Sequence, residues 1–329
     1  MEQFHSGVLK IDNETALNQI ITTLKKQTFE ILRKRGLVIA ISGGIDSSLT
    51  AALAIRSLGP DRVTALSLPE RDSNPDNTRL GKLLANHLGI RLLEENIDPV
   101  LDAFGCYKRR DEAIKRIFPE YDSSYKLKIV LSQTLMKTGG LNIYSLVIRD
   151  PDGQYQSCRL PRRELLEIVA ATNHKQRTRT QFTYYHADRL GYAVAGTPNR
   201  LEYDQGFFVK GGDGLADVKP IAHLYKTQVY SLARHLKLPQ EILAQKPTTD
   251  TYSLEQTQEE FYFSLPYEKL DLILWALNHD IQPLVVSKVM GFKVEQIQNF
   301  YSDIRQKRRM TEYLHRKALL IEPIHEIVS

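Results

Sequence analysis

Residues 38–48, Val38-Ile39-Ala40-Ile41-Ser42-Gly43-Gly44-Ile45-Asp46-Ser47-Ser48, join an apolar strand to a helix through a turn of two glycines and three hydroxyls. Small residues let backbone N–H groups face an anion, and the N-terminus of the following helix favours negative charge. The stretch therefore predicts a phosphate-binding loop. The common ATP-binding loop, GxxxxGK followed by Ser or Thr, is absent because no Lys follows the glycines.

Asp46 is the acidic residue of this loop. A carboxylate repels a polyphosphate unless a divalent cation such as Mg²⁺ lies between them, so Asp46 is predicted to be a metal ligand. The competing interpretation is a glycine-rich turn that binds nothing. SGGxDS after a strand resembles the pyrophosphatase loop of the N-type ATP pyrophosphatases. These enzymes cleave ATP between the α and β phosphates and activate a carboxylate or carbonyl group as an adenylate.

Composition sets broad limits on the protein. The 329 residues are 42% hydrophobic and 25% charged, which predicts one large or two small domains. Cys106 and Cys158 are too few and too far apart for a zinc site, a redox pair or a disulfide scaffold, which suits a reducing cytoplasm. No signal peptide or membrane span is evident, so a soluble, cytoplasmic protein is expected. The net charge of +5 permits a nucleotide or RNA partner without choosing between them.

Hydrophobic periodicity predicts an alternation of strands and helices. Helices are expected at about 13–35, from the loop to Gly59, and at 77–88 before Gly89; strands are expected at 38–41, 63–68, 90–97 and 192–195. This order predicts an α/β fold, a doubly wound, Rossmann-like parallel sheet. Ligands bind at the carboxyl ends of such strands, where the Ser42–Ser48 loop is placed.

Residues 105–165 interrupt this alternation and are interpreted as an insertion. Residues 142–161 alternate apolar and polar side chains around Asp150-Pro151-Asp152-Gly153, which predicts a β-hairpin. The charged run 108–112 is interpreted as a solvated helix face. The predicted domain comprises 1–104 and 166–265, with 266–329 as a helical region that completes it. Two amphipathic helices there, joined near Gly291, are expected to pack on their own domain.

A second group of polar residues lies between 173 and 226. Three segments place cations, a hydroxyl and a carboxylate around the end of a strand. They are the run Lys175-Gln176-Arg177-Thr178-Arg179, the stretch Gly196-Thr197-Pro198-Asn199-Arg200-Leu201-Glu202 and the loop Gly206–Gly214. These are constituents of a polyphosphate site. Together with SGGxDS, and in this order, they resemble the NAD synthase family, whose fold is of the adenine nucleotide alpha hydrolase type.

The resemblance implies a reaction and a set of roles. ATP adenylates the nicotinate carboxylate of deamido-NAD, and ammonia then displaces AMP. Ser42, Asp46 and Lys226 would be catalytic, and Asp46 and Glu202 would bind Mg²⁺. The implied ATP-binding residues are Ser42, Gly43, Gly44, Ile45, Asp46, Ser47, Ser48, Thr197, Lys226 and Thr248, and the implied deamido-NAD-binding residues are Arg177, Lys210, Asp217 and Lys307.

Some features depart from the family pattern. Gln258 stands where an acidic residue is common, Gln306 replaces a His, and the insertion is long enough to cover the substrate cleft. These departures leave open a different carboxylate as the acceptor. An RNA-modifying pyrophosphatase-loop enzyme is the further alternative, although no nucleic acid is expected as a partner.

Nitrogen supply and assembly are also implied by the resemblance. There is no room before residue 39 or after residue 304 for a separate amidase domain, and both cysteines are interpreted as structural, so free ammonia or ammonia from a separate amidase is expected. A homodimer without a membrane partner is expected.

Overall fold

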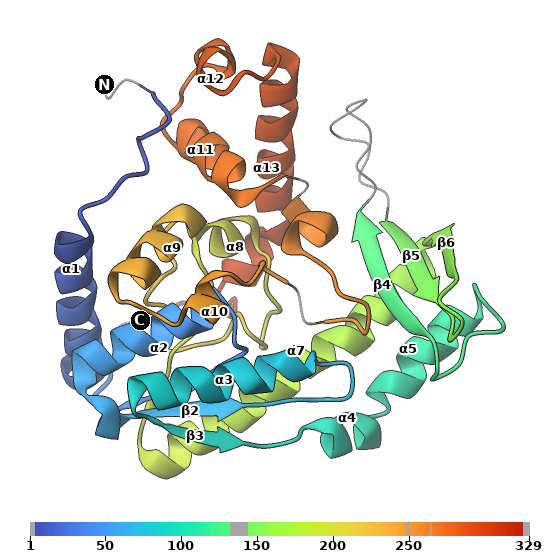
Figure 1. Cartoon of the computed structure of the whole chain (residues 1–329), viewed down its shortest axis with the longest axis horizontal. Helices are drawn as coiled ribbons and strands as arrows, with labels where there is room; N and C mark the ends of the chain where they lie inside the picture. The colour runs from blue at the N-terminus through green and yellow to red at the C-terminus, as the bar shows by residue number, and fades with distance from the viewer. Residues whose placement is uncertain (1–3, 132–143, 249–250, 264, 325–329) are drawn as a thin grey trace.

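The computed structural model describes residues 4–131, 144–248, 251–263 and 265–324 (Figure 1). Its larger sheet is parallel, in the order β3-β2-β1-β7. The strands are β1 (Leu37–Ala40), β2 (Val63–Ser67), β3 (Arg91–Glu94) and β7 (Ala193–Val194). All four predicted strands are present, although the fourth has only two residues. Because β1 lies between β2 and β7, the loop that follows β1 opens at the switch point of the sheet, where ligands bind.

Helices cover both faces of this sheet. On one face, α1 (Asn13–Lys26), α2 (Ile45–Leu58), α3 (Pro75–Leu88), α9 (Lys226–His235) and α10 (Gln240–Leu243) share one hydrophobic cluster with β1 and β2. On the other face, α4 (Asp98–Phe104), α5 (Cys106–Lys115) and α7 (Arg162–Leu190) bury side chains against Val38, Leu66 and Val194. The predicted doubly wound α/β fold is therefore confirmed.

The first helix ends earlier than the predicted residue 35. It continues from α1 into a π-helical turn, η1 (Gln27–Ile31), and then stops. Arg33 adopts a left-handed conformation with φ 54°, which a helix interior does not allow. The polar run 33–35 carries no periodic signal of this stop. A 3-10 turn, η2 (Pro60–Arg62), follows Gly59 and leads into β2.

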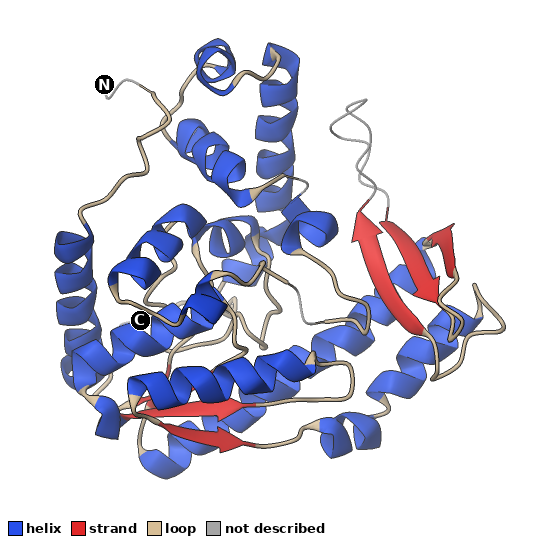
Figure 2. Ribbon diagram, viewed as in Figure 1, coloured by secondary structure: helices blue, strands red, loops and turns tan. Residues whose placement is uncertain are grey.

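The insertion contains a separate antiparallel sheet, seen apart from the parallel sheet in Figure 2. Its strands are β4 (Lys126–Leu131), β5 (Tyr144–Arg149) and β6 (Tyr155–Arg159), in sequence order. β5 and β6 form the predicted hairpin, and Asp150 N donates to Gln154 O at 3.0 Å across the turn. Residues 142 and 143 of the predicted hairpin segment lie outside the described residues. The side chains between the sheet, α5 and α7 form their own hydrophobic cluster.

The interpretation of 108–112 as a solvated face is wrong for one residue. Arg110 is only 5% exposed, because its guanidinium group reaches back to Asp72 in the loop after β2. Lys108 and Arg109, its neighbours, are exposed as predicted. A buried cation of this kind requires an ionic partner, and that partner lies 38 residues away in the sequence.

The C-terminal part is helical, as predicted (Figure 2). Its helices are α11 (Tyr267–Asn278), α12 (Pro283–Met290) and α13 (Val294–His315). Two shorter helices precede it, α8 (Arg200–Gln205) and the π-helical turn η3 (Glu259–Phe263). Val286 of α12 and Ile297 of α13 are fully buried against α11, so these helices pack on their own chain. Val285 and Val289 remain 41% and 39% exposed. No helix in the described part combines the length and apolarity needed to cross a membrane.

Candidate active site

The loop between β1 and α2 has the geometry of a phosphate site. Gly43 has φ 77°, and a Cβ atom there would lie 2.8 Å from Leu80 Cβ and 3.0 Å from Asn77 O, so only glycine fits. Gly44 is the N-cap of α2, and no side chain caps that helix end. The first N–H groups of α2 therefore remain available to an anion, with the positive end of the helix dipole behind them.

The serine hydroxyls of the loop fall into two groups. Ser42 is exposed and lies 3.4 Å from Ser47, Oγ to Oγ. Both line the cavity described below. Ser48 is fully buried and donates to Gly44 O at 2.8 Å. Ser47 is 4% exposed and also donates to Gly44 O, at 3.0 Å. The Ser42 hydroxyl is thus exposed in the site, while Ser47 and Ser48 support the first turn of α2.

Three charged side chains meet beside this loop. Lys226, the first residue of α9, is 2% exposed, and its ammonium group forms an ion pair with Asp46 Oδ2. Asn199 Nδ2 donates to the other oxygen, Asp46 Oδ1, at 3.1 Å. Glu202 lies on the same wall, three residues after Asn199. The structure thus brings Asp46, Glu202 and Lys226 to one wall, and their predicted catalytic and metal-binding roles stay predictions.

Glu202 is held by two local contacts. Its Oε2 accepts the N–H of Asn199 at 3.1 Å, while the Asn199 side chain accepts the N–H of Leu201 and Glu202, which forms a capping box at the start of α8. Its Oε1 accepts from Gln258 Nε2 at 2.8 Å. Gln258, the residue that departs from the family pattern, therefore supplies an amide donor to the carboxylate of Glu202, a predicted metal ligand.

Burial and charge shift the protonation of these groups. Burial, with the nearby Asp46 carboxylate, raises the pKa of Glu202 to about 7, against the lowering effect of Lys226. Burial opposes the charge of Lys226, but the carboxylates of Asp46 and Glu202 outweigh it, so the pKa of Lys226 is raised. Lys226 is thus charged at neutral pH, and the carboxylate pair carries an electrostatic strain that an additional cation would relieve.

Asp271 supports this arrangement and was not predicted. It is fully buried in α11, and it accepts the backbone N–H of Lys226 at 3.3 Å and of Thr227 at 2.7 Å. It thereby caps the first turn of α9. Burial raises the pKa of its carboxyl group to about 6, against these N–H donors. The sequence feature that could have identified Asp271 is its position as a single carboxylate among apolar helix residues, Leu270, Leu272 and Ile273.

Asp46, Glu202 and Lys226 line a cavity of about 720 Å³. Of the predicted ATP-binding residues, all except the buried Ser48 contribute to its wall: Ser42, Gly43, Gly44, Ile45, Asp46, Ser47, Thr197, Lys226 and Thr248. The cavity continues past Phe207 and Phe208 to Ile129 and Tyr144 of the insertion. The insertion therefore contributes to the cleft, as the sequence indicated, and no sequence signal identified these two residues in particular.

The predicted dinucleotide-binding residues do not line this cavity. Arg177 Nε donates to Lys210 O at 3.3 Å, and Lys210 Nζ donates to Tyr313 O at 2.8 Å, so these two lie side by side. Asp217 accepts from the N–H of Val194, the last residue of β7, at 2.7 Å. Lys307 is 7% exposed and donates to Tyr262 O at 2.8 Å. Their substrate roles stay predictions.

The cationic run 175–179 is divided by its position on α7. Arg179 and Gln176 line the cavity, but Lys175 is buried behind it and contacts carboxylates. The interpretation of the whole run as part of a polyphosphate site is therefore wrong for Lys175. Helical geometry explains the division, because consecutive positions on α7 face different directions.

A parallel sheet with a phosphate loop at its switch point, and with a carboxylate pair and a lysine beside that loop, defines an N-type ATP pyrophosphatase. The family model described as NAD synthase matches residues 16–118 and 110–311, and the chain belongs to this family. The NH(3)-dependent NAD(+) synthetase of Rhizobium meliloti is 53% identical over 98% of this chain and 96% of its own length. The enzyme of that name from Thermotoga neapolitana is 34% identical over 91% of this chain and 97% of its own length.

Solved structures share the fold at lower identity. The NMN synthetase of Francisella tularensis matches with a TM-score of 0.63 and 21% identity, covering 94% of this chain and 99% of the other. The NH3-dependent NAD synthetase of Campylobacter jejuni matches with a TM-score of 0.62 and 20% identity, covering 95% and 100%. These similarities support the arrangement of sheet and helices.

Proposed function

We infer that this chain is an ammonia-dependent NAD synthetase. It joins the nicotinate carboxylate of deamido-NAD to AMP with release of pyrophosphate, and ammonia then displaces AMP to form the amide of NAD. The observation that carries this function is the convergence of the phosphate loop, Asp46, Glu202 and Lys226 on one cavity. The full-length similarity to enzymes named NH(3)-dependent NAD(+) synthetase supports it.

The residues of the loop account for the pyrophosphate leaving group. The N–H groups at the start of α2, with the exposed Ser42 hydroxyl, can donate to the β and γ phosphates. Lys226 places a fixed positive charge at the same wall, where negative charge increases as the bond between the α and β phosphates breaks. Both features favour departure of pyrophosphate, and hence adenylation of the carboxylate.

Mg²⁺ fits the acidic residues of this site. Asp46 and Glu202 offer carboxylate oxygens, the pKa of Glu202 is raised partly by Asp46, and Mg²⁺ is usually bound by one or two carboxylates together with substrate phosphates. When bound, the ion neutralises charge on the phosphates. Asn199 and Gln258 orient the two carboxylates by donating one hydrogen bond to each.

The identity of the carboxylate substrate is the one point of the proposal for which the cavity also fits an alternative. Phe207 and Phe208 line the apolar end of the cavity, with Phe207 stacked on Tyr262 at 4.7 Å between centroids, and they offer aromatic faces to a pyridine ring. A smaller pyridine nucleotide, such as nicotinate mononucleotide, would meet the same rings, and the NMN synthetase of Francisella tularensis shares the fold. Arg177, Lys210, Asp217 and Lys307 are proposed to favour the dinucleotide.

The test supplies Mg²⁺, ATP and ammonium with either deamido-NAD or nicotinate mononucleotide. We expect AMP, pyrophosphate and NAD in equal amounts with deamido-NAD. Without ammonium, we expect labelled pyrophosphate to exchange into ATP only when the carboxylate is present. Release of ADP and phosphate would contradict the pyrophosphatase assignment, and a higher kcat/KM with the mononucleotide would replace the proposed acceptor.

Assembly and nitrogen supply belong to the same proposal. A homodimer is proposed, and sedimentation equilibrium of the purified chain tests it. Free ammonia is proposed as the nitrogen donor, with a separate amidase as an optional source. The nitrogen donor is tested by comparing ammonium with glutamine in the same assay, where glutamine alone should give no NAD.

A further inference from the structure

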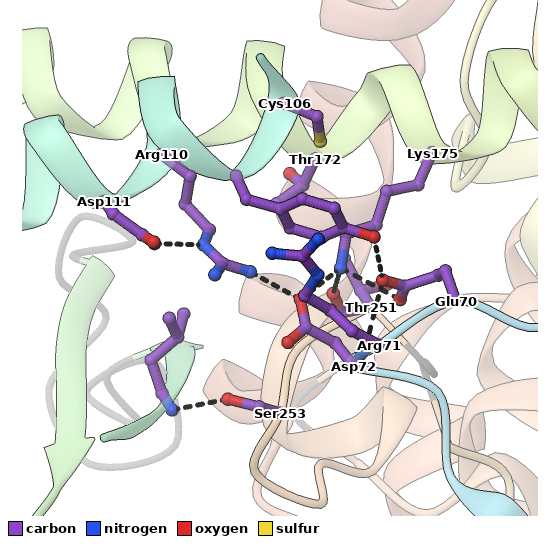
Figure 3. Close-up of polar contacts among 12 residues, drawn as sticks. Glu70, Arg71, Asp72, Cys106, Arg110, Asp111, Thr172, Lys175, Thr251 and Ser253 are labelled. Carbon is purple, nitrogen blue, oxygen red and sulfur yellow. Dashed lines mark hydrogen bonds and ion pairs between the residues drawn. The ribbon is translucent and has the colours of Figure 1, made fainter. Parts of the chain in front are cut away.

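A buried network of charged side chains lies behind the cavity, and the proposed reaction gives it no role (Figure 3). Its centre is Lys175 of α7, whose side chain is 1% exposed. The Lys175 ammonium group contacts Glu70 Oε1 at 3.0 Å, Asp72 Oδ2 at 2.6 Å and the carbonyl oxygen of Thr251 at 3.1 Å. An ammonium group has three N–H donors, so these three acceptors use all of them.

Two cations of the network, Lys175 and Arg110, contact three carboxylates. Arg110 of α5 forms an ion pair with Asp72 and donates to Asp111 Oδ1 at 2.8 Å. The Tyr107 hydroxyl donates to Glu70 Oε2 at 2.8 Å. Burial raises the pKa of Asp72, but Lys175 and Arg110 outweigh it, so the pKa of this carboxyl group is lowered. Asp72 is therefore ionised at neutral pH, and it would keep its ion pair with Arg110 if Lys175 were lost. Loss of Lys175 alone would instead remove the ion pair of Glu70, whose side chain is 0% exposed.

Lys175 connects two walls of the cavity without lining it. The loop after β2 presents Leu68, Pro69 and Ser73 to the cavity, and it presents Glu70 and Asp72 to Lys175. One helical turn further along α7, Arg179 donates to Leu68 O at 3.3 Å and to Ser73 Oγ at 3.2 Å. α7 thus holds this loop at both of its ends.

The other wall is the segment 251–258. Thr251 and Tyr252 line the cavity, and the Thr251 carbonyl group accepts from Lys175. Leu254 N then donates to Leu127 O of β4 at 2.9 Å, and Gln258 reaches Glu202 at 2.8 Å. Thr251 and Gln258 are seven residues apart in one segment that is hydrogen-bonded to β4 of the insertion. A shift of Thr251 would therefore also shift Gln258 and, through it, the Glu202 carboxylate.

We propose that Lys175 is a positioning residue for ATP, because it ties Glu70 and Asp72 to Thr251 and so fixes the separation of the two walls between which the nucleotide binds. The proposal rests on the proposed function in one respect, that the nucleotide in this cavity is ATP. The proposal also gives α5 a role in ATP binding. Arg110 and Tyr107 of this helix contact Asp72 and Glu70, the two carboxylates that Lys175 holds.

The experiment separates positioning from stability. Lys175→Met removes the tie and leaves an unbalanced charge, so both the melting temperature and ATP affinity should fall. Glu70→Gln combined with Lys175→Met removes one charge of each sign, and the glutamine keeps a carbonyl oxygen for Tyr107. The double variant should recover most of the melting temperature while its affinity for ATP stays at least about tenfold below wild type.

Affinity is measured calorimetrically with Mg²⁺ and an ATP analogue whose α–β bridge is a methylene group, and KM and kcat are measured with ATP. We expect the change in KM to exceed the change in kcat. The control is Arg116→Ala, which removes the pairs with Glu164 and Glu167 between α5 and α7, away from the cavity wall. It should lower the melting temperature slightly and leave the affinity unchanged.

A double variant that binds the analogue as tightly as wild type would overturn the proposal, as would an equal loss of affinity in Arg116→Ala. Because the analogue is bound and not consumed, the comparison decides the role of Lys175 whichever carboxylate is the acceptor. A wild-type protein that does not bind the analogue would overturn this proposal together with the ATP assignment.

Discussion

Replacement of Glu202 by Gln should stabilise the protein and abolish its activity. Gln keeps an acceptor oxygen for the N–H of Asn199, and it can still pair with the Gln258 amide. It removes the carboxylate that burial and Asp46 make costly to ionise. The variant keeps the shape of the site and removes one negative charge. It therefore tests whether that charge lowers the stability of the folded protein.

The magnitude follows from the pKa of Glu202, which is raised from 4.5 to about 7 in the folded protein. Between these values the unfolded chain releases a proton that the folded protein retains, so the free energy of unfolding falls as pH rises through this window. The full loss, reached above pH 7, is roughly 3 kcal/mol. Gln does not titrate, so Glu202→Gln should be more stable than wild type by up to about 3 kcal/mol at pH 8, and by about 1 kcal/mol at pH 5.

The assay is urea unfolding at pH 5 and pH 8 without ATP or Mg²⁺, with pyrophosphate release measured in parallel. Glu120→Gln, at an exposed position, is the matched control and should show no gain at either pH. A Glu202→Gln protein that is less stable than wild type at pH 8, or that gains equally at both pH values, would refute the electrostatic reasoning. Full pyrophosphate release by this variant would refute the metal-ligand role.

Three further variants test the site. Asp46→Asn should lower kcat for pyrophosphate release at least about a hundredfold, because it removes a phosphate-site carboxylate and the partner of Lys226; wild-type turnover would contradict this. Gly43→Ala should prevent binding of the ATP analogue in calorimetry, since its Cβ would lie 3.0 Å from Asn77 O at φ 77°; unchanged affinity would show that the loop can rearrange. Asp271→Ala leaves two N–H groups of α9 without their acceptor, so the free energy of unfolding in urea should fall by about 1–3 kcal/mol. The kcat should fall as well, because Asp271 holds the helix start that carries Lys226. An unchanged kcat would show that Asp271 does not position Lys226 for the reaction.

The parallel sheet and its phosphate loop were predictable because their signals are local. The apolar run before Ser42 and the glycines at 59 and 89, which end α2 and α3, mark these elements without reference to the rest of the chain. The grouping of Asp46 with Glu202 and Lys226 needed the resemblance to a family, since these residues are up to 180 positions apart. The structure brings them together at the edge of one sheet.

Other parts of the site depend on tertiary contacts that have no local signal. Arg110 and Lys175 belong to charged runs that are indistinguishable from solvated helix faces, yet both are buried because Asp72 lies between them. Asp271 is an N-cap that acts on a helix 44 positions earlier in the sequence. The left-handed turn at Arg33, with φ 54°, also has no residue type that predicts it, because glycine or asparagine is the usual residue in that conformation.

Two of the hydrophobic clusters that border the cavity have a consequence for how the protein unfolds locally. Ile41 and Leu80 on one side belong to the cluster around the parallel sheet, whereas Ile129 and Tyr252 on the other belong to the cluster of the insertion. Elements with separate cores can unfold locally at different free energies. Amide hydrogen exchange in β4 should therefore be faster than in β1, and bound nucleotide should slow it, because the nucleotide can bind only when both clusters are folded.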